Sequence, residues 1–139
     1  MTAYIPNELR QQVIARAHGL CEYCLIHQDD TPFSHQIDHV IALKHEGKTE
    51  LMNLALSCLL CNRHKGSDLT TFDPVTQELT LLSNPRAQRW DEHFVLRGVY
   101  IVGQTAVGRA TVRLLQMNSP QQLLHRQSLM EIGRYPLLD

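Results

Sequence analysis

Four cysteines stand in two pairs of identical spacing, Cys21 with Cys24 and Cys58 with Cys61, and they are all the cysteines of the chain. Two C-x-x-C pairs can place four thiolates tetrahedrally around one zinc ion. Two disulfides are the alternative, but Met1–Pro6 has no basic stretch followed by an apolar one, so no secretion signal is indicated. Paired cysteines in a reducing compartment more often bind metal. The spacing therefore predicts a structural Zn²⁺ site.

Polar residues between and after the cysteine pairs could carry hydrolytic chemistry. Asp38 offers an anionic oxygen and Asn62 a carbonyl oxygen, which are ligands that Mg²⁺ or Mn²⁺ accepts while it keeps bound water. His39 has an unperturbed pKa of about 6.5, so it can take a proton from water near neutral pH. Asn53 could fix the neighbouring loop by hydrogen bonds and so orient His39. A divalent cation beside a general base is one means of cleaving a phosphodiester bond.

The cysteine pairs and the polar residues together resemble the HNH nuclease family, whose members are also called ββα-metal nucleases. The resemblance covers roughly a third of the chain. It implies that His39 is the general base and that Asn53 orients it. It also implies that Asp38 and Asn62 hold a catalytic Mg²⁺ or Mn²⁺, and that the enzyme hydrolyses phosphodiester bonds of DNA. The matching motifs are Cys21-x-x-Cys24, Ile37-Asp38-His39-Val40-Ile41, Asn53-Leu54 and Cys58-x-x-Cys61-Asn62-x-x-Lys65-Gly66.

The choice of the second metal ligand rests on helix geometry. The family name implies a second histidine where this chain has Asn62, and His64 is the alternative ligand. In a helix that begins at Asn62, two residues correspond to about 200° of rotation, so Asn62 and His64 point in opposite directions. This favours Asn62 and puts Lys65 on the same side, where it could reach a phosphate oxygen. Arg63 and Lys44 are the other candidate nucleic-acid contacts.

The helices and strands predicted around these residues indicate a mixed α+β fold. The pattern predicts an N-terminal helix over residues 6–19, a strand over 34–43, a segment 51–56 leading into the second cysteine pair, and a helix from Asn62. Adjacent residues of a strand point to opposite faces. Asp38 and His39 can therefore serve one site only if the strand bends or ends there. We expect an irregularity near Asp38 to Val40.

The second half of the chain has no cysteine and predicts further elements. A strand is expected over 78–82, a hairpin turning at Arg97-Gly98, a helix over 105–117, and a last helix over 123–132 with Ser119 as N-cap and Pro120 at its first position. The helix 105–117 has an apolar side that suits the core or a dimer face. We expect one domain over 1–139, with an HNH core of about 20–70 and a C-terminal extension of about 71–139 that has no assigned chemistry.

The net charge and the distribution of apolar residues limit the classes of protein to which this chain could belong. The net charge of −1 argues against tight, sequence-independent binding of nucleic acid, although a locally basic site remains compatible with it. No apolar run approaches 20 residues, so no membrane span and a cytoplasmic location are expected. DNA is the expected partner, and a homodimer is open. The rival functions are a non-catalytic, zinc-stabilised nucleic-acid-binding module and a nuclease subunit that is active only with a partner.

Overall fold

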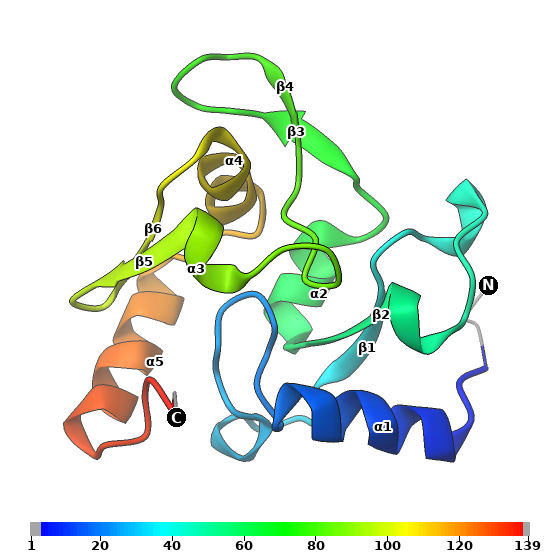
Figure 1. The fold of residues 1–139 in the computed structure, drawn as a ribbon. Helices are drawn as coiled ribbons and strands as arrows, with labels where there is room; N and C mark the ends of the chain where they lie inside the picture. Colours follow the sequence, from blue (N-terminus) through cyan, green and yellow to red (C-terminus); the bar gives the residue numbers. More distant parts are fainter. Residues whose placement is uncertain (1–3, 138–139) are drawn as a thin grey trace.

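The computed structural model describes residues 4–137 and shows a mixed α+β fold (Figure 1). Within these residues the strands form three antiparallel two-stranded sheets, β1–β2, β3–β4 and β5–β6. The helices are α1 (Asn7–Ala17), α2 (Leu59–Lys65), α3 (Trp90–His93), α4 (Ala106–Leu114) and α5 (Pro120–Glu131). The strands are β1 (Gln36–His39), β2 (Leu54–Ser57), β3 (Thr70–Phe72), β4 (Leu79–Leu81), β5 (Phe94–Arg97) and β6 (Tyr100–Gly103). Short 3-10 turns occur at Gln28–Asp30, Leu43–His45 and Leu51–Asn53.

Helix α1 forms where the sequence predicts it and packs on the first sheet. Its buried residues Val13 and Ala17 contact Leu54 and Leu56 of β2. The helix stops because His18 adopts the left-handed conformation, from which its N–H reaches back to the last turn. The apolar side of α1 thus covers one face of β1–β2.

Strand β1 is shorter than expected, and its early end confirms the predicted irregularity. It stops at His39 rather than continuing to residue 43, and the chain bends at Val40. The bend is held because Val40 N–H donates to the Asn53 carbonyl at 2.9 Å. Asp38 pairs with Ala55 in the sheet register, so the antiparallel partner β2 fixes its position.

Helix α2 begins at Leu59, three residues before the expected start at Asn62. The reason is its N-cap, since the Cys58 sulfur accepts a hydrogen bond from the Cys61 N–H. The helix ends at Lys65, where Gly66 takes a positive φ and donates to the Asn62 carbonyl. The second cysteine pair therefore belongs to the first turn of the helix.

The C-terminal half contains one hairpin that the sequence pattern missed and one that it predicted. Strand β3 falls where a boundary was expected, and it pairs with β4. This β3–β4 hairpin exposes the apolar side chains of Phe72, Leu79 and Leu81. The expected hairpin β5–β6 forms and turns at Gly98, which has a positive φ. In Figure 1 these two hairpins lie at separate edges of the molecule.

The last helix is capped as expected, and a buried arginine anchors it. Ser119 accepts from the Gln122 N–H, and Pro120 is the first residue of α5. Arg126 of α5 is fully buried and donates to the carbonyls of Val99 and Met117 at 2.7 Å each. Buried residues of the 105–117 segment, including Ala110, confirm that its apolar side is core.

The largest group of buried residues spans both halves of the chain. It contains the four cysteines and Tyr23 from the first half, and Phe94, Ile101, Leu115, Met117, Leu129 and Tyr135 from the second. The C-terminal extension therefore packs directly on the cysteine pairs. Among residues 4–137, no helix combines the length and apolar character needed to cross a bilayer.

Candidate metal centre and nuclease site

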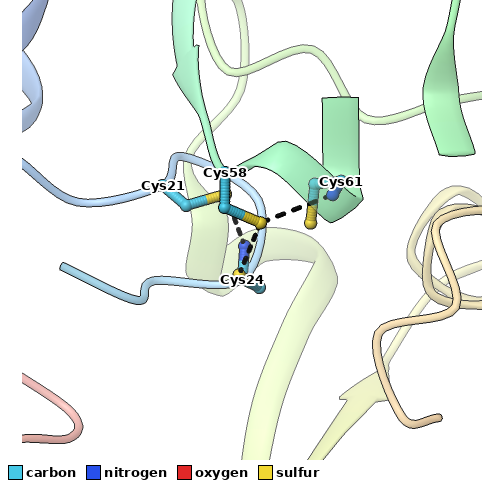
Figure 2. Close-up of side chains that lie close together, drawn as sticks. All are labelled: Cys21, Cys24, Cys58 and Cys61. Atoms are coloured by element: carbon cyan, nitrogen blue, oxygen red, sulfur yellow. Dashed lines mark hydrogen bonds between the residues drawn. The ribbon is translucent and has the colours of Figure 1, made fainter. Parts of the chain in front are cut away.

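The four cysteine side chains converge from two separate segments (Figure 2). Cys21 and Cys24 come from the loop after α1, and Cys58 and Cys61 come from the start of α2. All four are buried and free, and their sulfur atoms lie within 4.8 Å of one another. The arrangement has the donors of a closed structural metal site.

The sulfur spacing fits zinc. Four sulfurs at about 2.3 Å from a tetrahedral Zn²⁺ are about 3.8 Å apart, and the Cys24 and Cys58 sulfurs are separated by 3.7 Å. That separation is far longer than a disulfide bond of about 2.05 Å. The cluster is therefore suited to zinc and not arranged as two disulfides.

Each pair uses the same local geometry to point its sulfurs inward. The Cys24 N–H donates to the Cys21 sulfur at 3.4 Å, and the Cys61 N–H donates to the Cys58 sulfur at the same distance. Burial alone raises the pKa of the Cys21 thiol, but hydrogen bonds from the other three thiols outweigh burial and hold its pKa well below the ordinary value. The hydrogen bonds with Cys21 in turn raise the pKa of Cys24 and of Cys61. Binding of a metal ion would therefore require these thiols to lose their protons.

Three of the residues expected to do chemistry line one cavity of about 430 Å³. Asp38 and His39 reach it from the end of β1, and Asn62 reaches it from α2. The same wall includes Lys44, which is exposed. The oxygen donors of Asp38 and Asn62 fit a hard divalent cation that keeps part of its water. His64 is not among the residues that line this cavity, in keeping with the helix argument for Asn62.

Asp38 is held by two donors in addition to facing the cavity. Tyr23 donates its hydroxyl to Asp38 Oδ2 at 3.0 Å, and Lys65 Nζ lies 3.3 Å from Oδ1 and 3.2 Å from Oδ2. Burial raises the pKa of Asp38, while the charge of Lys65 and both hydrogen bonds oppose that rise. The carboxylate has about four acceptor positions, so these donors leave capacity for a cation.

The imidazole of His39 is half-buried and held by a hydroxyl group. Its Nε2 lies 2.9 Å from Thr49 Oγ1. Burial lowers the pKa of His39, the charge of Asp38 raises it, and the charge of Lys65 lowers it, with a net value below the ordinary one. A lowered pKa favours the neutral imidazole, which is the form that a general base requires.

Asn53 binds the loop that follows His39. Its Oδ1 accepts from the Ile41 N–H, and its Nδ2 donates to the carbonyls of Ile41 and Lys48, all at 2.9 Å. Gly47 lies against this contact, and a Cβ there would be 1.7 Å from the Ile41 oxygen. Asn53 thus closes residues 41–48 into a fixed loop beside His39, as its expected orienting role requires.

Two of the expected nucleic-acid contacts lie elsewhere than at the cavity wall. Lys65 is only 2% exposed, and its ammonium also contacts the His39 and Val40 carbonyls at 3.3 and 3.4 Å. We expected Lys65 to reach a phosphate, but its buried ammonium group forms an ion pair with Asp38 instead. Arg63 is exposed, but it lines a different cavity, of about 360 Å³, with α5.

Sequence reasoning missed two residues that contact the site. Tyr23 stands between the first two cysteines, and its place inside a C-x-x-C pair was the available signal. Thr49 belongs to no motif of regular spacing, and it reaches His39 only because of the way the intervening loop folds. Both contacts depend on how the chain folds back, which residue order does not specify.

Comparison with known proteins gives one match. Residues 21–68 match a family model described as HNH endonuclease. No curated protein and no solved structure matches the chain. The matched segment contains both cysteine pairs and all the cavity residues named as metal ligands or base, and it stops before the C-terminal extension.

Proposed function

From the HNH unit at residues 21–68, we propose that this protein is a metal-dependent endonuclease that hydrolyses phosphodiester bonds of DNA. The observation that carries the proposal is the single cavity lined by Asp38, His39 and Asn62. A general base and two oxygen ligands on one wall are the parts that a one-metal phosphodiesterase needs. The cysteine cluster, with zinc bound, would hold α2 against the first cysteine pair and so keep Asn62 opposite β1.

The proposed chemistry divides between His39 and the ligand pair. His39 accepts a proton from water, and its lowered pKa keeps the ring in the receptive form. Thr49 and the loop tied by Asn53 set the direction of the ring. Asp38 and Asn62 would hold a Mg²⁺ or Mn²⁺ ion, which would supply positive charge for the phosphate and the leaving oxygen.

The test is cleavage of supercoiled plasmid DNA. Zinc-loaded protein freed of other metals is incubated with Mg²⁺ or Mn²⁺ beside His39→Ala, with His125→Ala as the matched control, since His125 lies on α5 and contacts the Asp30 carbonyl. We expect nicking or linearisation that requires added cation and His39, and that survives in His125→Ala. The form of the product also reports whether one or both strands are cut.

Two other results would replace the proposal. Binding of DNA without cleavage and without dependence on divalent cation would favour a zinc-stabilised binding module. Uptake of Mn²⁺ at Asp38 with no cleavage of any substrate would favour a subunit that needs a partner. Equal cleavage by His39→Ala would remove His39 as the base.

A further inference from the structure

Three consecutive residues of the first cysteine pair are each held by the C-terminal extension. The Glu22 carboxylate accepts from Arg86 Nη2. The Tyr23 carbonyl accepts from Trp90 Nε1 at 2.8 Å, and the Cys24 carbonyl accepts from the Tyr135 hydroxyl at 2.7 Å. The donors come from three places in the extension, so this is a repeated contact and not one chance pairing.

These contacts give hydrogen-bond partners to backbone carbonyls in a segment that is neither helix nor strand. Residues 22–24 form a turn, and Tyr23 and Cys24 are 1% and 0% exposed. Buried carbonyls outside helices and sheets need partners from elsewhere. The indole of Trp90 and the phenol of Tyr135 provide them, and they fix the backbone that directly follows the Tyr23 side chain.

The side chain of Tyr23 connects this fixed backbone to Asp38. Its hydroxyl donates to Asp38 Oδ2 at 3.0 Å, within a fully enclosed environment. A buried tyrosine ring has little freedom, so the place of its hydroxyl follows the place of its backbone. The contact with Oδ2 thereby links the extension to the carboxylate that lines the cavity.

We propose that Tyr23 is a positioning residue for the cation-binding carboxylate of Asp38, and that Trp90 and Tyr135 of the extension set the place of Tyr23. The extension, which lies outside the matched family segment, thereby acts on the active site without touching it. The inference rests on the proposed function in taking Asp38 as a ligand of the divalent cation.

The experiment measures Mn²⁺ affinity by electron paramagnetic resonance on zinc-loaded protein. Asp38→Asn identifies the binding that depends on Asp38. Tyr23→Phe removes the hydroxyl and keeps the ring, and we expect it to raise the Mn²⁺ dissociation constant about tenfold, since loss of a partner behind a metal ligand commonly weakens metal binding by that factor or more. Tyr135→Phe and Trp90→Phe should shift it in the same direction by a smaller factor, with zinc content unchanged in all three.

Two controls separate positioning from general loss of stability. Tyr100→Phe makes the same chemical change at a side chain that is 51% exposed. Ile101→Val shortens a fully buried side chain of the extension and should lower the melting temperature. Neither should change the Mn²⁺ dissociation constant.

Each outcome decides the inference. An unchanged Mn²⁺ affinity in folded, zinc-loaded Tyr23→Phe would overturn it, as would an equal loss in Ile101→Val or an absence of Asp38-dependent binding in the wild type. Should Tyr23→Phe not fold, unchanged affinity in both Tyr135→Phe and Trp90→Phe would overturn it. The experiment measures binding and not cleavage. If the Mn²⁺ affinity depends on Tyr23 but the protein cuts no DNA, the proposed function is refuted and this inference stands.

Discussion

At the scale of single residues, the environment of Asp38 sets the character of the site. Burial raises the free energy of the charged carboxylate of Asp38. Lys65 compensates for this with a positive charge, since its Nζ lies 3.2 Å from Asp38 Oδ2. A divalent cation at the same carboxylate would meet that positive charge. We therefore expect Lys65 to stabilise the metal-free protein and, under the proposed function, to weaken cation binding at Asp38.

Replacement of Lys65 by methionine separates these two effects. Removing one partner of a buried ion pair is expected to reduce the unfolding free energy of the metal-free protein by about 3 kcal/mol. Added Mg²⁺ should restore part of this loss, because it gives Asp38 a new positive partner. Chemical denaturation with and without Mg²⁺ measures both effects. The exposed neighbour Arg63→Met is the control, and an equal loss there would contradict the assignment.

The hydroxyl of Thr49 can be removed with little change in shape. Thr49→Val deletes the contact to His39 Nε2, and under the proposed function we expect the cleavage rate to fall about tenfold, which corresponds to one lost hydrogen bond. Mn²⁺ affinity should not change, since Thr49 does not contact Asp38. Rates measured for Thr80→Val, whose hydroxyl contacts the Glu78 carbonyl, should equal the wild type. A normal rate in Thr49→Val would mean that the loop alone orients His39.

At the scale of elements, the loop 41–48 depends on the absence of a side chain at one position. A Cβ on Gly47 would overlap the Ile41 carbonyl that Asn53 holds. We expect Gly47→Ala to reduce the unfolding free energy by about 1–3 kcal/mol, the usual range for overpacking, and to slow cleavage through His39. Lys48→Ala, at an exposed position of the same loop, should do neither. Denaturation and plasmid cleavage run side by side check both expectations.

The junction between the β3–β4 hairpin and α4 is expected to lose stability at low pH. Asp73 is buried and accepts from Arg109 Nε at 3.0 Å and Nη2 at 2.8 Å, and this contact holds the pKa of Asp73 well below its usual range. A lowered pKa stabilises the fold above the unfolded-state pKa of about 4, and this stability is lost as the pH falls towards the folded-state value.

Asp73→Asn tests this dependence. We expect a lower melting temperature than wild type at pH 7, and a difference that narrows progressively below about pH 4. Thermal unfolding from pH 7 to pH 3 measures it. Asp91→Asn, at an exposed ion pair with Arg89, should change little at any pH. A constant difference for Asp73→Asn down to pH 3 would show that its charge is not the cause.

Local signals in the sequence were enough for some elements and not for others. The cap Ser119 with Pro120 and the turn at Gly98 act over a few residues, so α5 and β5–β6 could be predicted. Strand β3 has residue types that favour a strand, but with three residues it is too short to show a clear alternation, so the pattern missed it. Its pairing with β4 and its contacts with α4 define it in the fold. An irregularity near Asp38 to Val40 was predicted from the need for Asp38 and His39 to share one site, although the strand was expected to run to residue 43. The burial of Lys65 was not predictable, because helix geometry gives its side but not its depth.

At the scale of the whole molecule, the cysteine cluster joins the loop after α1 to α2 within the largest core. Removal of zinc should leave four buried thiols without their common ligand, and we expect a marked fall in melting temperature and loss of cooperative unfolding. Titration with Zn²⁺ after chelation should restore both. Mg²⁺ should not, because it does not favour sulfur ligands. Full recovery with Mg²⁺ would refute a structural zinc site.

The contacts that link Tyr23, Cys24 and Asp38 to other parts of the chain differ in the length of chain they enclose. Those within the matched segment 21–68 are short, with 15 residues from Tyr23 to Asp38 and 27 from Asp38 to Lys65. Those from the extension span 67 residues for Trp90 and 111 for Tyr135. Closing a longer loop has a larger entropic penalty, and distant contacts form late in folding. We therefore expect the contacts within residues 21–68 to form before those of the extension, so that the position of Tyr23 would be set only after the rest of the molecule has folded.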